Sequence, residues 1–137
     1  MSIATAPTQS LPLRRGRAGL IALWAVQIAL AGMFLLAGGS KLAGTPAMVA
    51  LFDAVGIGQW FRYATGLIEV GSALALLVPA VAVFGALALA PTMIGAILTQ
   101  LFIVRGSPVL PAVLLVGVAA VIWARRRELP FNRRTPR

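Results

Sequence analysis

Residues 63–104 read YATGLIEVGSALALLVPAVAVFGALALAPTMIGAILTQLFIV, and this stretch decides the fold of the chain. Its 42 residues carry one charged side chain, that of Glu69. A single α-helix of this length would measure about 63 Å, whereas the hydrocarbon core of a bilayer is about 30 Å thick. The stretch therefore predicts two membrane-spanning helices, and Pro79, which cannot continue a helix, marks the break between them.

Two further apolar runs flank this stretch. With them, the sequence predicts one transmembrane domain over residues 18–124, with four spans near residues 18–39, 61–78, 81–104 and 108–124. Pro91 falls inside the third span, where proline can bend a helix and free the carbonyl of Leu87. A cleaved signal peptide is the competing interpretation of residues 18–39. That run is too long for the apolar region of a signal peptide, however, and more apolar runs follow it.

The connector between the first two spans contains a short amphipathic helix. Thr45 followed by Pro46 is a typical helix start, with a capping residue and then proline in the first turn. Apolar side chains recur at helical spacing up to residue 55, and glycines at positions 56 and 58 stop the pattern. These features predict a helix at the membrane interface, with Trp60, Phe61 and Tyr63 as aromatic anchors beside it.

The composition limits the chemistry of the chain. It is 60% hydrophobic and 11% charged, whereas a soluble domain is about half apolar and about a quarter charged. There is no cysteine and no histidine, which removes disulfides, cysteine redox chemistry and the usual zinc and haem ligands. The sequence therefore predicts no metal site, and a redox role would need a bound organic molecule or a partner protein.

The net charge of +9 is concentrated near the two ends of the chain. Of the 12 basic residues, nine fall in residues 1–17 and 125–137, which are predicted to be flexible basic tails. Nucleic-acid binding is one meaning of such a charge, but this placement fits membrane topology and anionic lipid better. Only Lys41, Arg62 and Arg105 lie at the opposite ends of the spans, so the bias predicts both tails and both termini in the cytoplasm.

Small residues form stripes at helical spacing on two of the predicted spans. They are Ala18, Ala22, Ala25, Ala29 and Gly32 on the first, and Gly85, Ala88, Thr92, Gly95 and Thr99 on the third. Such faces let helices approach closely in lipid, so we expect them to line helix contacts. The sequence thus predicts an all-α fold: a polytopic membrane four-helix bundle with a short interfacial helix between spans 1 and 2. It leaves open whether the bundle is tightly packed or holds a small ligand.

Glu69 is the first candidate for a functional residue, because a carboxylate is costly at hydrocarbon depth. It lies on one helix face with Arg62, about two turns or 10 Å further along the span. The other possible partners are Lys41, Gln27, Gln100 and Arg105. One interpretation is a polar cluster that holds an anionic or quinone-like head group, with Glu69 binding or relaying a proton. The other is a structural ion pair of Glu69 and Lys41, with Arg62 as an interfacial anchor and Gln27 as a helix contact.

Several short motifs follow one another in a characteristic order. The first span ends in AGGSKL at residues 37–42, a proline-initiated helix follows, and residues 52–57 read FDAVGI. The second span contains WFRYATGLIEV at residues 60–70 and ends in LLVP at residues 76–79. Over about residues 20–124 this order resembles the DoxX-like family of small four-span bacterial membrane proteins, most sharply at Lys41 and at Gly66 with Glu69.

The resemblance implies a multi-pass protein of the bacterial plasma membrane. Some members of the family are linked to quinone-dependent sulfur oxidation or to membrane-associated oxidative-stress complexes. An accessory or quinone-contacting membrane subunit is therefore implied, with quinone as the cofactor to test and a redox protein as a partner. Two alternatives stay open: a proton-coupled small-molecule transporter, and a structural or assembly protein without a ligand. Small multidrug transporters carry their membrane acid in the first span, where this chain has none.

Overall fold

The computed structural model describes residues 16–130, and the regular elements of this part of the chain are all helices. Their bounds are α1 Arg17–Ala43, α2 Pro46–Val55, α3 Gln59–Leu76, α4 Ala82–Thr99, the π-helical turn η1 Gln100–Val104, α5 Val109–Arg125 and the 3-10 turn η2 Arg126–Glu128. The predicted all-α class is confirmed, and α2 is the short helix expected between the first two spans. The predicted tails lie for the most part outside the described residues.

Three helical segments of the described part are long and apolar enough to cross a membrane. They are Arg17–Ala43 with 27 residues, Ala82–Val104 with 23 and Val109–Glu128 with 20. The chain is therefore a multi-pass membrane protein. The remaining long helix, α3, has 18 residues and packs against α1 and α4. Arg62 and Glu69 make it more polar than the other three, and both side chains are buried, as charges within a membrane bundle must be.

Proline and glycine set helix ends where the sequence predicts them. α2 begins at Pro46 and ends before Gly56, whose φ of 78° lies in the left-handed region that glycine tolerates. Pro79 lies in the turn between α3 and α4. Pro91 lies inside α4 and does not end it, since the helix continues to Thr99.

The first helix is longer than the predicted span. α1 ends at Ala43 rather than near residue 39, because the glycines at 38 and 39 weaken a helix without breaking it. Gly44 then takes the left-handed conformation at φ 67°, and its amide donates to the carbonyl of Lys41. Lys41 therefore projects from the last turn of α1 and not from a connector.

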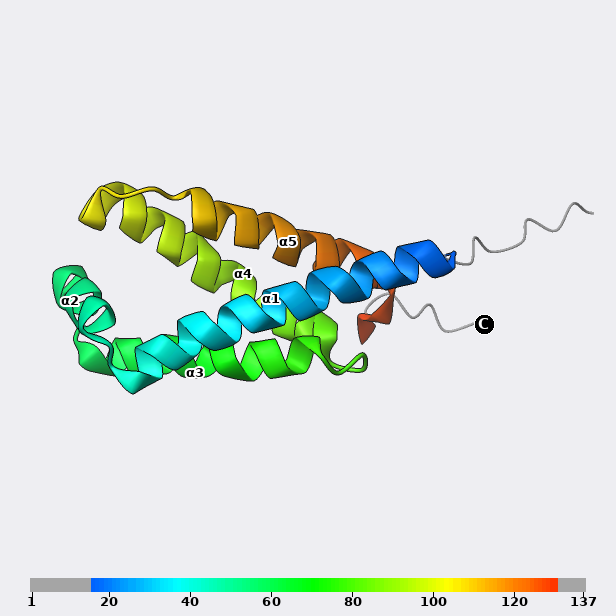
Figure 1. Cartoon of the computed structure of the whole chain (residues 1–137), viewed down its shortest axis with the longest axis horizontal. Helices are drawn as coiled ribbons and strands as arrows, with labels where there is room; N and C mark the ends of the chain where they lie inside the picture. The colour runs from blue at the N-terminus through cyan, green and yellow to red at the C-terminus, as the bar shows by residue number, and fades with distance from the viewer. Residues whose placement is uncertain (1–15, 131–137) are drawn as a thin grey trace, which may run out of the picture.

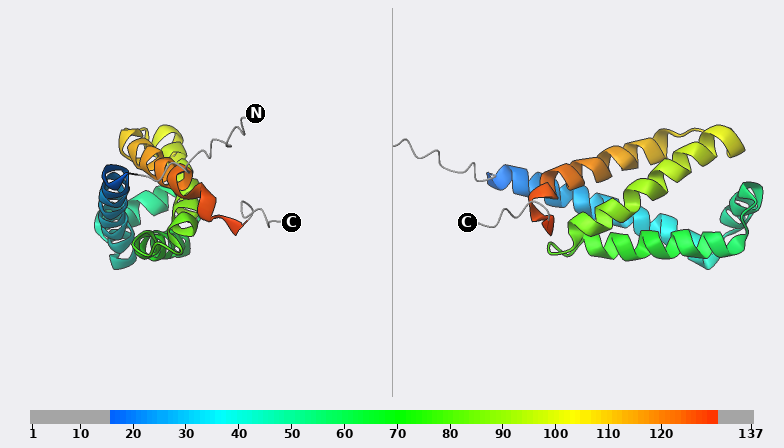
Figure 2. Two further views of the ribbon diagram at one scale, coloured as in Figure 1. Left: turned by 90° about the vertical axis from the view of Figure 1, so that its right-hand side faces the viewer. Right: turned by 180° about the vertical axis from the view of Figure 1, so that it is seen from behind.

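The long helices pack as two pairs, α1 with α3 and α4 with α5, which are joined by contacts between α3 and α4. The end of the bundle that contains the start of α1 and the end of α5 is here called the terminal end. The two pairs lie close together there (Figure 1). They diverge toward the opposite end, here called the α2 end. Seen along the bundle in Figure 2, the long helices surround a centre with α2 behind it. Because α2 contacts α3, η1 and α1, it links the two pairs at their divergent end.

The core lies between the paired helices and combines aliphatic side chains with small residues. Its fully buried large side chains include Phe34, Leu76, Leu89, Val118 and Val121. Where α3 meets α4, a Cβ on Gly85 would lie 2.8 Å from the carbonyl oxygen of Ser72, so this approach requires glycine. Close backbone approach is what stabilises such contacts in lipid, where water exclusion contributes little.

The small-residue stripe predicted on α1 faces outward. All of its members are exposed: Ala18, Ala22, Ala25, Ala29 and Gly32. α1 packs instead through the face that holds Leu23, Gln27, Leu30, Phe34 and Gly38. The expectation that the stripe lines a contact within the bundle is therefore wrong for α1. In lipid both faces of a helix are apolar, so helical spacing alone does not select the packed one. On α4 the stripe is divided, with Gly85 buried and Gly95 exposed.

Candidate functional site

Lys41 and Glu69 form an ion pair inside the contact between α1 and α3. Nζ of Lys41 lies 2.7 Å from Oε2 of Glu69, and the two side chains are 14% and 1% exposed. The pairing that the sequence suggests for these residues is thus present in the structure. Direct contact of opposite charges is the arrangement that lets both remain in a dry environment.

Two glycines bring the helices close enough for this ion pair. Gly38 lies three residues before Lys41, and Gly66 lies three residues before Glu69. A Cβ on Gly38 would lie 2.9 Å from the carbonyl oxygen of Gly66 and 3.0 Å from Cβ of Glu69. A Cβ on Gly66 would lie 3.1 Å from the carbonyl oxygen of Gly38. The two backbones therefore touch at this crossing, and the ion pair depends on the absence of side chains there.

Gly38→Ala should push α1 away from α3 and destabilise the bundle by about 1–3 kcal/mol, the usual cost of overpacking. Gly39→Ala is the matched control, because a Cβ there would meet no atom within 4 Å. The control should be neutral or stabilising by up to about 1 kcal/mol, since alanine favours a helix more than glycine does. Unfolding by SDS from a mild detergent measures both variants. Equal stability of the two would show that the Gly38 crossing does not set the helix spacing.

Arg62 is bound to the end of α1 and not to Glu69. Its side chain is 4% exposed, and its Nη1 donates to the carbonyl oxygen of Lys41. Its guanidinium carbon lies 4.2 Å from the centre of the Tyr63 ring, a cation–π distance. A cation at the carbonyl end of a helix is favourable, because the exposed carbonyl groups carry partial negative charge there. Arg62 therefore caps α1 and is buried against it.

Further hydrogen bonds connect Arg62 to α2. Nε of Arg62 donates to Oε1 of Gln59 at 2.6 Å. Nε2 of Gln59 donates to Oδ1 of Asp53 at 2.6 Å and to the carbonyl oxygen of Val49 at 3.0 Å. These contacts hold α2 and the start of α3 against the end of α1.

Gln27 and Gln100, the other predicted members of the polar cluster, lie apart from the ion pair. Gln27 and Lys41 are 14 residues apart on α1, about 21 Å along the helix axis. Gln100 lies in η1 and is half-buried, and among the described residues its side chain has no hydrogen bond to Lys41 or Glu69. The structure thus brings together Lys41, Glu69 and Arg62, and it separates the two glutamines from them.

Gln27 belongs to a second buried network, at the terminal end. Its Nε2 donates to the carbonyl oxygen of Leu76 at 2.6 Å, and its Oε1 accepts from Nε and Nη2 of Arg125 at 3.0 and 2.9 Å. Nη1 of Arg125 donates to the carbonyl oxygen of Pro79 at 3.5 Å and to Oε1 of Glu128 at 3.0 Å. These contacts, here called the Arg125 network, join α1, α3, α5 and the α3–α4 turn.

The role of Arg125 is not predicted from the sequence, in which this residue belongs to the run of arginines that begins the C-terminal tail. The side chain of Arg125 is 5% exposed, whereas Arg126 and Arg127 are exposed. One signal was available. In a bundle of four alternating helices the start of the first and the end of the last lie together. A polar residue near the start of α1, such as Gln27, is then a natural partner for the first arginine after α5.

The Lys41–Glu69 site retains unused hydrogen-bonding capacity. The ammonium group of Lys41 has three N–H donors, and one of them bonds to Oε2 of Glu69. No described residue donates to Oε1 of Glu69. Because every fully buried side-chain nitrogen and oxygen in residues 16–130 has a partner, Oε1 is not fully enclosed. Lys41 thus keeps further N–H donors, and Glu69 keeps an acceptor oxygen that no described residue bonds, in a site that is nearly closed to solvent.

An all-α, multi-pass membrane bundle with an ion pair between its first and third helices is the class of protein that this fold and site define. The sequence model of the DoxX-like family matches residues 25–124, and the chain belongs to that family. The matched region includes all five of the predicted polar residues: Gln27, Lys41, Arg62, Glu69 and Gln100. No curated protein and no solved structure matches the chain.

Proposed function

We propose that this chain is an accessory membrane subunit of a redox or oxidative-stress system, and that it binds a quinone-like head group at the Lys41–Glu69 site. The observation that carries the proposal is that no residue of 16–130 donates to Oε1 of Glu69, which lies beside an ammonium group inside an apolar helix contact. Family membership supports it, because the resemblance to DoxX-like proteins implies a link to quinone chemistry. Proteins of one fold and family can differ in activity, so the proposal depends on the chemistry of the Lys41–Glu69 site.

The hydrogen-bonding groups of a quinone match those of the site. A quinone ring has two carbonyl oxygens that accept hydrogen bonds, and the reduced quinol has two hydroxyl groups that donate them. Lys41 can donate to the former, and Glu69 can accept from the latter. Glu69 lies nearly three helical turns from the start of α3, so a head group there leaves its apolar tail in lipid. Since the chain has no cysteine and no histidine, a partner redox protein would supply or take the electrons.

A structural or assembly role is the second candidate, and one observation favours it. Glu69 is 1% exposed, and its helix contacts α1 through the Gly38 and Gly66 backbones. An ion pair held so closely can fix the geometry of two helices without binding anything. In that case the chain would bind a protein partner through its surface, and no ligand would occupy the site.

Native mass spectrometry of the protein extracted into a mild detergent tests the proposal. A retained mass equal to that of the native quinone would support the quinone-contacting subunit. A stable protein partner without any small molecule would favour the assembly role and overturn the quinone proposal. If neither is retained, uptake of a small cation into proteoliposomes under a pH gradient would instead support the transporter alternative.

We further propose that the protein lies in the bacterial plasma membrane with both termini in the cytoplasm. Arg17 begins α1, and Arg126 and Arg127 begin η2, at the terminal end. Lys41 lies in the last turn of α1 and Arg105 follows η1, toward the α2 end. This distribution agrees with the nine-to-three bias of the whole sequence. Fusions of a reporter that is active only in the cytoplasm should therefore be active at either end of the chain. Activity of an export-dependent reporter at both ends would contradict this topology.

A further inference from the structure

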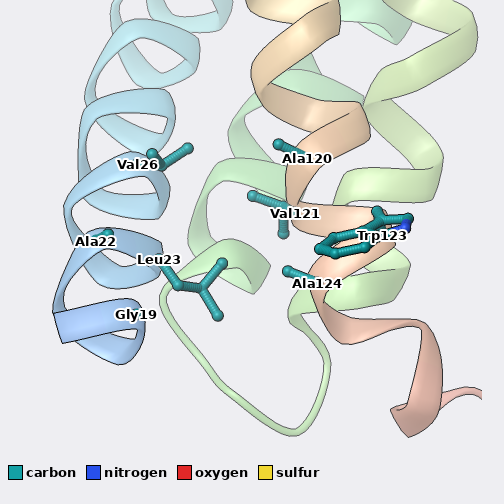
Figure 3. A pocket seen from close by; sticks show the side chains of 8 residues that line it. All are labelled: Gly19, Ala22, Leu23, Val26, Ala120, Val121, Trp123 and Ala124. Atoms are coloured by element: carbon teal, nitrogen blue, oxygen red, sulfur yellow. The ribbon is translucent and has the colours of Figure 1, made fainter. Parts of the chain in front are cut away.

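An apolar groove lies between α1 and α5 at the terminal end. Its volume is about 340 Å³, and it is open along one side of the bundle. Figure 3 shows side chains of the two helices facing each other across it. The lining includes Gly19, Ala22 and Val26 of α1 and Ala120, Trp123 and Ala124 of α5. The groove exists because small residues on both helices leave space where larger side chains would meet.

Basic side chains flank the end of this groove. Arg17 begins α1 two residues before Gly19, and Arg126 and Arg127 follow α5 directly; all three are exposed. The guanidinium carbon of Arg126 lies 4.6 Å from the centre of the Trp123 ring, which also lines the groove. The nearby Glu128 is engaged by Arg125. The apolar groove thus ends beside segments that carry three exposed arginines, and the one described carboxylate at this end, that of Glu128, is paired with Arg125.

We propose that this groove binds the acyl chain of one anionic phospholipid, whose phosphate is held by Arg17, Arg126 and Arg127. The apolar lining fits a hydrocarbon chain, and guanidinium groups bind phosphate through paired hydrogen bonds. An aromatic residue such as Trp123 commonly lies at the level of the lipid head groups. The inference is independent of the proposed function, since the Lys41–Glu69 site lies toward the opposite end of α1.

Charge favours a lipid over a second copy of the chain. A symmetric dimer through this groove would place the same arginines of two copies close together, and like charges in contact are unfavourable. An anionic phospholipid reverses this situation, because its head group neutralises the arginines while its chain fills the groove. The proposal also goes beyond a general attraction of the tails to anionic lipid, because it assigns a bound molecule to a defined place.

Lipid retention by variants of the full-length protein tests the proposal. The protein is reconstituted with equal amounts of phosphatidylglycerol and phosphatidylcholine, extracted into a mild detergent, and its bound lipids are counted by native mass spectrometry. Ala22→Phe fills the groove from α1, and Ala120→Phe fills it from α5. Ala25→Phe is the matched control, because Ala25 is an exposed residue of α1 outside the groove lining. The double change Arg17→Gln with Arg126→Gln removes charge and leaves the groove intact.

We expect the wild type and Ala25→Phe to retain one phosphatidylglycerol, preferred over phosphatidylcholine by about tenfold or more. Ala22→Phe and Ala120→Phe should lose most of this lipid, and the double arginine variant should lose the preference. Two results would overturn the proposal: no preference in the wild type, or full retention of phosphatidylglycerol by both groove-filling variants. The two groove-filling variants start from exposed residues on different helices, so a folding defect in one leaves the other to decide.

Discussion

Lys41→Met should be among the most damaging single substitutions in the chain, lowering the free energy of unfolding by about 3–5 kcal/mol. The change leaves the carboxylate of Glu69, which is 1% exposed, without the cation that lies 2.7 Å from it. Removing one partner of a buried pair costs far more than the pair itself contributes. Unfolding by SDS from a mild detergent would measure the loss. Arg105→Met is the control, because it removes an exposed positive charge toward the same end of the bundle.

A second change at Glu69 should restore part of this loss. In the double variant of Lys41→Met and Glu69→Gln both charges of the ion pair are gone, so the cost of an unpaired carboxylate disappears. Groups in direct contact usually show coupling energies of about 0.5–3 kcal/mol, and we expect a value at the upper end of that range. Additive effects of the two single changes would show that the ion pair does not hold α1 against α3.

Arg125→Ala should destabilise the opposite end of the bundle by about 3 kcal/mol, since hydrogen bonds to charged groups contribute about 1.5–3 kcal/mol each. The change removes the donors that satisfy Oε1 of Gln27 and removes a bond to the carbonyl oxygen of Pro79. Gln27 is completely buried, so water cannot easily replace the lost donors. The same SDS titration measures this variant.

Arg127→Ala is the matched control for Arg125→Ala, because it removes the same type of side chain two residues further along, from an exposed position. Its effect should be within about 0.5 kcal/mol, as is usual for surface substitutions. If both variants lose the same stability, the effect comes from the positive charge at this end of the chain. The Arg125 network would then not be what joins α1 to α5.

Most of the fold follows from the sequence, because its determinants are local. The long uncharged runs set the number of long helices, and the chain breaks at Pro79 and Gly56 as predicted. The start of α2 at Pro46 follows from the chemistry of a helix N-terminus. The end of α1 was harder to place, since two glycines in a row suggest a stop, whereas the helix continues to Gly44.

The arrangement of the polar residues follows less completely, because it depends on which helix faces meet. The pairing of Lys41 with Glu69 was predictable, since few cations lie within reach of a carboxylate in an apolar run. The partners of Gln27 were not predictable, because the depth of a residue in the membrane does not show which helix it faces. Gln27 bonds to Arg125, 98 positions away in the sequence. Because the sequence does not show which helix faces meet, the stripe of small residues on α1 was predicted to lie in a helix contact, whereas it lies on the surface.

The most direct test of the proposed function is quinol binding by the protein in nanodiscs, with Glu69→Gln compared against Glu128→Gln. Both changes turn a carboxylate into an amide, but Glu128 is an exposed residue of η2, which follows α5 at the terminal end, away from the Lys41–Glu69 site. Titration with a short-chain quinol, whose hydroxyl groups can donate to a carboxylate, should give wild-type affinity for Glu128→Gln. The affinity of Glu69→Gln should fall by about tenfold or more, the loss expected when a hydrogen bond to a charged group is removed. Equal quinol affinity in all three proteins, or no binding by the wild type, would contradict a quinone site at Glu69.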